Sequence, residues 1–579
     1  MVINRQRYRE KVSRMISWGH WFALFNILFT LVLGSRYLFV SDWPASLPGR
    51  IYAISSLLGH FSFIVFTAYL LIIFPLTFVV MSQRWLRVFS AVIATTGLTL
   101  LLVDSEIFTR FYLHLSPFVW ELVVNPEQSE LARDWQLMFI CAPVIFLLEM
   151  TFGAWCWQKL RWLRRYRLGK SLAVLFISAF LATHLLYIWA DANFYRPITM
   201  QKNKFPLSHP MTARTFLEKH RLLDKHEYQR KLAQFGDPAA LAVEYPLSTV
   251  TFNESASHYN LLMVVIDGPG SPITLKSMPT LVNFANSGIE FTSHYNSGYR
   301  KDTGLLSLFY GISSAYLDGI LAARRPSELI IALSARGYQF GFFSSDGFDT
   351  PLYRQALLAD FSLPAPLKQS NWQTALQWQK WITHCDVSIP WFSYINLHGN
   401  GMQATAAEQH GNAHGIDDQI AAILNTIEKK GISNNTVIII TAVNDNGANN
   451  GRAIDNFSRQ QLRTPLLIHW PDIPAQKINK FTSHEDIMTT LMQKLLYVKN
   501  SPSDYSQGED LFAASRKHNW MVTGENGTLI ITMPTQTLVL DNNGTYQLFD
   551  FQGNQIKNEK PHLALLLQVL TDVKRFIAD

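Results

Sequence analysis

The sequence predicts a five-helix transmembrane domain followed by an α/β domain, in which a mostly parallel sheet is sandwiched by helices. Five apolar stretches in the first 191 residues are each long enough to cross a bilayer, which needs about 20 residues. From residue 260 on, short apolar strands alternate with helical runs, a pattern typical of a sheet covered on both faces. One of these strands ends in Asp267-Gly268. Open α/β sheets bind their ligands at such strand ends.

Composition indicates a membrane protein of more than one domain. The chain has 579 residues, of which 48% are hydrophobic and only 16% are charged. The net charge is +7, but the basic residues are not clustered as a nucleic-acid face requires, so nucleic acid is not an expected partner. The three cysteines form neither a disulfide framework nor a zinc spacing. We expect a transmembrane domain over 1–191, a basic interfacial linker over 192–250 and an α/β domain over 251–579.

The distribution of Lys and Arg predicts the orientation of the spans. Basic residues precede the first span and fill the loops between the second and third and between the fourth and fifth spans, whereas the alternate loops are poorer in them. By the positive-inside rule the N-terminus is cytoplasmic, and an odd number of spans places residues after 191 on the far side, the periplasm of a bacterium with two membranes. The predicted spans lie near 16–39, 53–80, 86–105, 135–157 and 171–191.

Glu149, within the fourth predicted span, has two interpretations. An intramembrane carboxylate is by default a hypothesis of function. The alternative, which we favour, is that Glu149 lies near the cytoplasmic end of its span and pairs with Arg161 or Arg164.

The linker interleaves basic and aromatic residues, and the run 211–217 begins an amphipathic helix with Thr212 as a candidate N-cap. This helix is either a solvated linker or an interfacial helix at the outer leaflet, with its apolar face in lipid and its basic face on phosphates. A helix N-terminus with one arginine is a competent phosphate site. The candidate lipid-binding residues are Met211, Thr212, Ala213, Arg214, Phe216, Lys204 and Lys219.

The soluble domain is predicted from strand and helix patterns that alternate along the chain. The predicted strands are 261–266, 338–343, 391–397, 436–441, 464–469, 528–532 and 537–541. The predicted helices are 279–287, 326–336, 371–384, 415–429, 484–496 and a terminal helix over 560–577.

Motifs in this domain resemble those of the sulfatase and alkaline-phosphatase superfamily, over about residues 255–515. They are Ile266-Asp267-Gly268, Met278-Pro279-Thr280-Leu281, Asp417-Asp418-Gln419-Ile420, Thr464-Pro465-Leu466 and Ser483-His484-Glu485-Asp486, in the same order. The resemblance implies a sulfatase-like fold whose catalysis needs a nucleophile and a metal ion held by carboxylates and histidines.

The whole chain is similar to one membrane-bound branch, the YejM family, also called PbgA. Trp18-Gly19-His20-Trp21-Phe22 and Trp189-Ala190-Asp191-Ala192-Asn193 carry this similarity. It implies an inner-membrane protein of Gram-negative bacteria that senses lipopolysaccharide. Such proteins bind lipid A phosphates at the outer leaflet and have been linked to cardiolipin. They restrain the LapB adaptor, which helps the FtsH protease degrade the first committed enzyme of lipid A synthesis.

The nucleophile position of the superfamily is altered. The lipoteichoic-acid-synthase-like branch has a Thr in a Gly-x-Thr-x-Asp pattern, and the matching run here is Gly298-Tyr299-Arg300-Lys301-Asp302. Arg300 stands where the hydroxyl should be, and arginine is neither a nucleophile nor a neighbour that a metal ion tolerates. Thr303 could substitute only if the loop shifts register. The candidate catalytic residues are therefore Thr303 and Asp267.

The metal-ligand positions are altered as well. The candidate ligands are Asp267, His398 and Asp445, and Asp445 requires a two-residue slip after the strand that ends at Thr441. The histidine expected shortly before Thr464 is missing, and His484 is a further candidate. Alternatively, Arg300, Lys301 and Asp302 form a salt-bridged loop that fills the old cavity.

These residues leave three functions open. The one we favour is a regulator with a degenerate hydrolase fold, which requires no cofactor, reads lipid A at the linker and signals through its spans to the adaptor. The second is a metal-dependent phosphatase or phosphoglycerol-type transferase acting on lipid head groups. It requires Asp267, Asp445 and Thr303 to converge on Mg²⁺ or Mn²⁺. The third is a cardiolipin carrier, although nothing in the sequence indicates a lipid-length tunnel.

Overall fold

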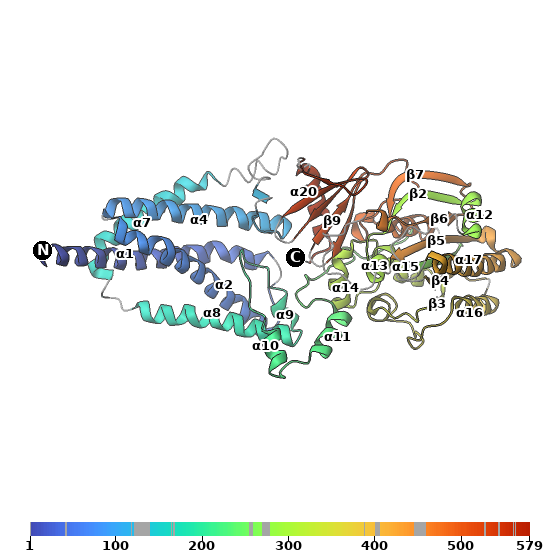
Figure 1. Cartoon of the computed structure of the whole chain (residues 1–579), viewed down its shortest axis with the longest axis horizontal. Coiled ribbons are helices and arrows are strands. Elements are labelled where there is room, and N and C mark those ends of the chain that lie inside the picture. Colours follow the sequence, from blue (N-terminus) through green and yellow to red (C-terminus); the bar gives the residue numbers. More distant parts are fainter. Residues whose placement is uncertain are drawn as a thin grey trace.

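An elongated helical bundle and a larger α/β region lie end to end in the computed structural model (Figure 1). The N-terminus lies at the far end of the bundle, and the C-terminus lies where the two regions meet. The structure describes residues 2–40, 43–80, 82–116, 119–120, 139–163, 165, 168–253, 259–268, 278–386, 388–399, 406–444, 459–525, 528–541, 545–557, 559, 561 and 563–578.

The bundle contains the apolar helices that the sequence predicts. They are α1 (Val2–Gly34), α2 (Leu47–Ala68) with its continuation α3 (Phe74–Val79), α4 (Gln83–Phe111), α7 (Cys141–Leu163) and α8 (Leu168–Ala192). Four described segments are long and apolar enough to cross a membrane: Tyr8–Phe39, Leu47–Val79, Gln83–Arg110 and Gly169–Ala192. Helix α7 is a fifth apolar helix beside α1 and α4, and its crossing remains a prediction.

Glu149 is fully buried in the bundle, and its partner differs from the one predicted. Asn26 of α1 donates a hydrogen bond from Nδ2 to Glu149 Oε2 at 3.1 Å. This contact joins α1 to α7. Of the two arginines expected to pair with Glu149, Arg161 does not pair with it among the described contacts, and Arg164 lies outside the described residues. Helices α2 and α8 also approach closely, since a Cβ on Gly59 would lie 2.6 Å from the Phe180 Cα. Small residues allow such backbone contact between membrane helices.

A seven-stranded sheet forms the centre of the α/β region, in the order β3-β4-β1-β5-β6-β2-β7. Only β6 runs antiparallel to its neighbours. The sheet is therefore mixed, and mostly parallel as predicted. The strands are β1 (Asn260–Gly268), β2 (Ile289–Tyr295), β3 (Gln339–Ser344), β4 (Trp391–His398), β5 (Thr436–Asn444), β6 (Leu466–His469) and β7 (Gln476–Ser483).

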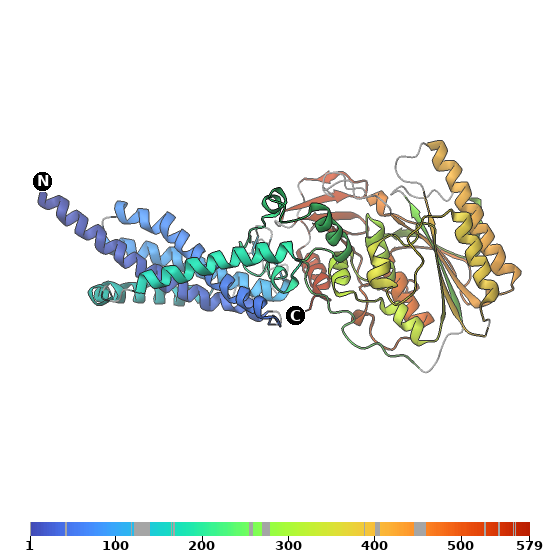
Figure 2. The same ribbon diagram turned by 90° about the horizontal axis from the view of Figure 1, so that it is seen from below.

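Helices cover both faces of this sheet (Figure 2). Along β1, Leu262, Val264 and Ile266 pack against one helical layer, and the alternate residues pack against the other, which explains why the whole strand is apolar. The first layer contains α12 (Pro279–Ser287), α16 (Asn371–His384) and α17 (Ala406–Lys429). The second contains α13 (Lys301–Tyr310), α14 (Leu317–Ala323), α15 (Glu328–Ala335) and α19 (His484–Thr490).

A second, five-stranded antiparallel sheet was not predicted as a separate layer. It joins β8 (Met521–Glu525), β9 (Thr528–Thr532), β10 (Gln536–Leu540), β11 (Tyr546–Asp550) and β12 (Gln555–Ile556), and α20 (Leu563–Lys574) packs on it. Its apolar cluster includes Val103 and Ile107 of α4. Lys574 Nζ also donates to the Thr109 carbonyl at 2.9 Å. The small sheet therefore rests directly on the end of the bundle.

Candidate functional site

The carboxyl ends of the parallel strands gather polar side chains, and Asp267 lies at the centre of them. Its side chain, at the end of β1, is 1% exposed. Lys301 Nζ donates to Asp267 Oδ2 at 2.5 Å, and Asn396 Nδ2, from the neighbouring β4, donates to Oδ1 at 2.7 Å. Both oxygens of the predicted ligand are therefore occupied by side chains of the same domain.

Lys301 reaches this pocket because it is the first residue of α13, and its side chain is only 6% exposed. Its ammonium also forms an ion pair with Asp346, which follows β3 and is itself buried, and it lies 4.0 Å from Asp349 Oδ1. Ser344 donates its hydroxyl hydrogen to Asp346. A buried ammonium is tolerable only with such charge and hydrogen-bond partners. Lys301 thus joins α13 to the ends of three adjacent strands, β3, β4 and β1.

The described residues do not fit the divalent metal that the superfamily implies. Such ions take carboxylate and histidine ligands that are not already bound to a cation. Here an ammonium lies between Asp267 and Asp346. Within the described ranges, no group of three or more His, Cys, Asp or Glu side chains is placed to hold a metal ion. Asp445, the third predicted ligand, lies outside the described residues.

His398 lies opposite Asp267 in the β1–β4 pairing, at the same edge of the sheet. Asn371 fixes its backbone on both sides, because Oδ1 accepts from the His398 N–H at 2.9 Å and Nδ2 donates to the His398 carbonyl at 2.9 Å. The structure therefore brings His398 and Asp267 to neighbouring strand ends.

The loop before α13 has the ion pairs of the salt-bridged alternative. Arg300, at the nucleophile position of the motif, pairs with Asp302 at 3.2 Å with a partly exposed guanidinium, while the buried Lys301 ammonium pairs with Asp267. Thr303 closes the first turn of α13: its hydroxyl donates to the Arg300 carbonyl at 2.8 Å and accepts from the Arg300 N–H at 3.1 Å. These contacts of the Thr303 hydroxyl lie within the helix cap, and neither of them reaches Asp267.

His484, the further candidate ligand, is completely buried at the start of α19. Its ring nitrogens hydrogen-bond with Asn296 Oδ1 at 3.0 Å and Thr441 Oγ1 at 3.2 Å. Burial lowers the pKa of His484 to about 3, so the ring is neutral at physiological pH. These contacts are those of a structural histidine.

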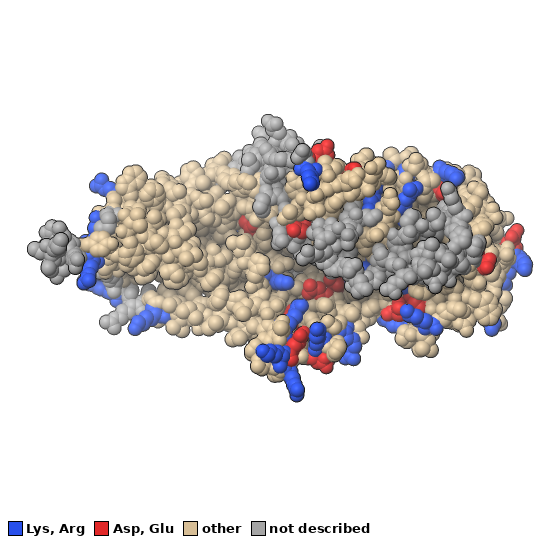
Figure 3. Space-filling view, in the orientation of Figure 1, with Lys and Arg blue, Asp and Glu red and all other residues tan. Residues whose placement is uncertain are grey.

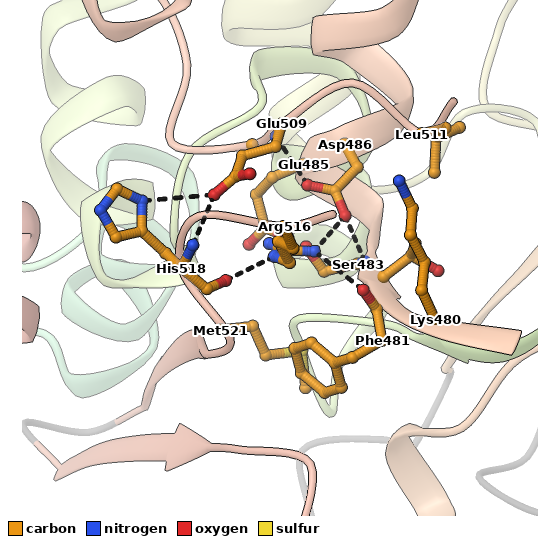
Figure 4. Close-up of polar contacts among 12 residues, drawn as sticks. Lys480, Phe481, Ser483, Glu485, Asp486, Glu509, Leu511, Arg516, His518 and Met521 are labelled. Atoms are coloured by element: carbon orange, nitrogen blue, oxygen red, sulfur yellow. Dashed lines mark hydrogen bonds and ion pairs between the residues drawn. The ribbon is translucent and has the colours of Figure 1, made fainter. Parts of the chain in front are cut away.

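The residues after His484 form a second buried polar cluster (Figure 4). Asp486 forms a buried ion pair with Arg516 and accepts backbone hydrogen bonds from Ser483 and Glu509, each at 2.8 Å. Glu485 accepts a hydrogen bond from the Ser297 hydroxyl at 2.6 Å, and among the described residues it pairs with no cation. Burial raises the pKa of the Glu485 carboxyl to about 7.

The junction between the two regions is the second place where a predicted residue meets a buried acid. Arg214, the first residue of α10 (Arg214–Lys219), donates from Nε and Nη2 to the two oxygens of Asp191 at 2.7 and 2.6 Å. Asp191 lies in the last turn of α8 and is 4% exposed, whereas Arg214 is 41% exposed. The guanidinium also lies 4.8 Å from the centre of the Tyr228 ring of α11 (Lys225–Phe235). The hydrogen bonds to Asp191 raise the pKa of Arg214 above its ordinary value.

The other predicted lipid-binding residues surround this ion pair with different exposures. Met211, Thr212, Phe216 and Lys219 are exposed and Ala213 is partly buried. Lys204 is buried, and burial lowers the pKa of its ammonium to about 8. Thr212 does not cap the helix, because Ala213 occupies the N-cap position, without a side-chain cap. The predicted helix is thus a six-residue segment whose arginine is held by α8.

Comparison with known proteins identifies the family. A family model for a domain of unknown function matches residues 5–252, and a sulfatase family model matches residues 270–495. The inner membrane protein YejM of Salmonella typhimurium is 55% identical, and the match covers 100% of both chains. The chain belongs to the YejM family. An uncharacterized protein of Haemophilus influenzae is 40% identical, with 97% of this chain and 96% of that one covered.

Solved structures similar to this YejM-family chain have low sequence identity to it. A protein of the alkaline phosphatase superfamily from Vibrio parahaemolyticus has a TM-score of 0.42 and 14% identity, covering 59% of this chain and 92% of that chain. The phosphonate monoester hydrolase of Agrobacterium radiobacter has a TM-score of 0.41 and 15% identity, covering 54% and 94%.

Sequence reasoning on this YejM-family chain missed the two residues that matter most for the charge of each site. Asp191 was read only as part of a family motif, and Lys301 only as a member of a loop. Asp191 is an acid at the end of an apolar helix, 23 residues before Arg214. That position is a signal from which its pairing with a nearby arginine could have been predicted. Asp346 offered no signal, since its contact with Lys301 depends on the order of strands in the sheet.

Proposed function

We propose that this protein senses lipid A at the periplasmic leaflet of the inner membrane and restrains a LapB-type adaptor. Through that adaptor it would limit FtsH-dependent degradation of the first committed lipid A enzyme, the role that the family resemblance implies. The α/β region then faces the periplasm, as the basic loops predict. In support, the visible face of the bundle carries Lys and Arg at its N-terminal end and is largely uncharged along its length (Figure 3).

The observation that carries the proposal is the half-exposed Arg214–Asp191 ion pair beside exposed apolar side chains. Leu207, Met211 and Phe216 are 79%, 58% and 59% exposed. Lipid A combines phosphates with acyl chains, so its site needs a cation at the level of the head groups and apolar side chains that can enter the acyl layer. The junction offers both at one end of the bundle.

Arg214 is suited to bind a phosphate because its carboxylate partner leaves one guanidinium nitrogen available. Asp191 accepts from Nε and Nη2, so Nη1 can donate to a phosphate oxygen without breaking the pair. Asp191 holds the guanidinium in a fixed orientation, which lowers the entropy lost on binding. Lys204 and Lys219 would add positive charge nearby.

The same ion pair suggests how binding reaches the membrane helices. Asp191 belongs to α8, and α8 packs on α2 through the close contact at Gly59. A phosphate bound to Arg214 weakens the ion pair between Arg214 and Asp191. The C-terminal end of α8, which contains Asp191, then changes its position. We place the contact with the adaptor in the bundle, downstream of this change.

The test is the lipid content of the full-length protein purified in mild detergent. In Arg214→Ala, lipopolysaccharide measured by mass spectrometry should fall to a small fraction of the wild-type amount. The matched control is Lys231→Ala in the same junction, whose ammonium pairs with Glu227, with both side chains well exposed. This control should retain its lipid.

Unchanged lipopolysaccharide in Arg214→Ala would contradict the proposed site. Cardiolipin in place of lipopolysaccharide in the wild type would favour the carrier hypothesis instead. Cardiolipin also has phosphates, and no contact among the described residues favours it over lipid A. No described contact favours the metal-dependent transferase either.

A further inference from the structure

The pocket at the end of β1 contains more negative than positive charge. Asp267 and Asp346 are both buried, and the exposed Asp349 lies at the rim, 4.0 Å from the Lys301 ammonium. Two buried carboxylates so close together repel each other unless a cation lies between them. The Lys301 ammonium is that cation, and it comes from the chain itself.

We infer that Lys301 permanently replaces the divalent metal ion of the sulfatase-like fold, so that this protein is stable and folded without a metal ion at the carboxyl end of β1. The inference goes beyond the proposed lipid-sensing function and does not depend on it, because the Arg214 junction shares no residue with this pocket.

Geometry and charge exclude a metal from the pocket as it stands. Mg²⁺ and Mn²⁺ bind carboxylate oxygens directly, at short distances, and need those oxygens to be accessible. Asp267 Oδ2 lies 2.5 Å from Nζ, and Oδ1 accepts from Asn396. A divalent ion bound to either oxygen would lie next to an ammonium that has almost no exposure to water to screen the repulsion.

The ammonium also does the structural work of a bound metal. Lys301 begins α13, Asp267 ends β1 and Asp346 follows β3, so one side chain fastens three separate elements. Asn396 of β4, between those two strands, adds a further link, since its Nδ2 donates to Asp267 Oδ1 at 2.7 Å and its Oδ1 accepts from Lys301 Nζ at 3.5 Å. Among the described residues, these contacts join the carboxyl ends of β1, β3 and β4 to the start of α13.

The first experiment uses the wild-type full-length protein in detergent, incubated with Mn²⁺ and then desalted. Elemental analysis should find far less than one Mn²⁺ per chain. The thermal unfolding temperature should be the same with Mn²⁺ and with EDTA, because a ligand that binds the native state raises it. Stoichiometric Mn²⁺, or a rise of several degrees that EDTA reverses, would overturn the inference.

The second experiment removes the ammonium. Lys301→Ser leaves Asp267 and Asp346 without their cation, so this variant should unfold at a lower temperature in EDTA and regain part of the difference with Mn²⁺. The matched control is Lys494→Ser, which removes an ammonium that is 40% exposed and lies 3.3 Å from Asp510. It should show no response to Mn²⁺.

A folded Lys301→Ser variant that gains nothing from Mn²⁺ would contradict the claim that the ammonium is what keeps the metal out. If Lys301→Ser does not fold, Asp346→Asn replaces it, since it keeps Lys301 and should remain insensitive to Mn²⁺. An Asp346→Asn variant stabilised by Mn²⁺ would overturn the inference in the same way.

Discussion

The carboxyl end of β1, called the sheet edge below, and the membrane junction each place a basic side chain against a buried aspartate. The two places differ in the exposure of the basic side chain. At the sheet edge the Lys301 side chain is 6% exposed and Asp267 is 1% exposed. At the junction Asp191 is 4% exposed while Arg214 is 41% exposed. The first cation has no route to a new partner without opening the core, whereas the second can meet a ligand at the surface.

This difference shows that the burial of the cation determines whether an ion pair can exchange its partner. A fully buried pair is costly to break, because it leaves an unpaired charge at low dielectric. A half-exposed pair is screened by water and exchanges partners at small cost. The residues that mark the fold as hydrolase-like are thus fixed, and the residues that can respond to lipid lie at the membrane.

Lys301→Met should give the largest loss of stability, because it leaves two buried carboxylates uncompensated. We expect the α/β region to lose about 3–5 kcal/mol of unfolding free energy. Thermal unfolding of the purified protein, with circular dichroism as the readout, measures the change. Adding Asp267→Asn to this variant should recover part of the loss; a double variant no more stable than Lys301→Met would argue against charge as the cause.

Glu485 shows what a buried acid does when it lacks a cation. Burial raises the pKa of its carboxyl from 4.5 to about 7, so the native state holds a proton that the unfolded chain releases. Stability from this group is therefore complete below about pH 4.5 and is lost as pH rises to about 7, by about 3 kcal/mol. Unfolding at a series of pH values should show that slope in the wild type and a smaller one in Glu485→Gln. Equal slopes would mean that another group titrates.

Arg214→Ala should cost less stability than either change, although it removes the lipid. Asp191 loses two charged hydrogen bonds, but the half-exposed position of Arg214 lets water reach the carboxylate once the guanidinium is removed, so we expect about 2 kcal/mol. The same thermal unfolding measurement applies, in lipid-free detergent. A loss as large as that of Lys301→Met would show that Arg214 is a structural residue of the same kind, and the comparison would fail.

Lys231→Ala provides the lower limit of the series. Its ammonium lies 3.0 Å from Glu227 one helical turn away, and both side chains are well exposed. Removing it should change stability by less than about 0.5 kcal/mol, within the error of thermal unfolding. A larger effect would indicate that exposed ion pairs of this junction are stronger than exposure alone predicts.

The sequence predicts the apolar elements well, because burial on both faces leaves a readable pattern. Strands β1, β4 and β5 are buried over almost their whole length and mainly apolar, and they lie where they were predicted. Strand β7 was missed because its first half is exposed at the edge of the sheet and therefore polar. In the small sheet only β9 and β10 were predicted; β12 has two residues, whereas β8 and β11 are as long as the predicted strands.

The two charged sites could not be derived from the sequence alone, for different reasons. Arg300 and Lys301 are adjacent, and only the start of α13 decides which of them turns into the pocket. Arg214 was identified correctly as a residue at the junction, but its pairing with Asp191 depends on how α10 folds back on the end of α8. Both cases turn on contacts between elements, which hydrophobic periodicity does not encode.

Native mass spectrometry of the wild-type protein, with lipid A and Mn²⁺ present together in excess, tests the central claim most directly. We expect a species that carries lipid A and no Mn²⁺, because the exposed Arg214 binds a phosphate and the buried Lys301 excludes the metal. One Mn²⁺ per chain with no lipid A would contradict it, and would place the working site back at the end of β1.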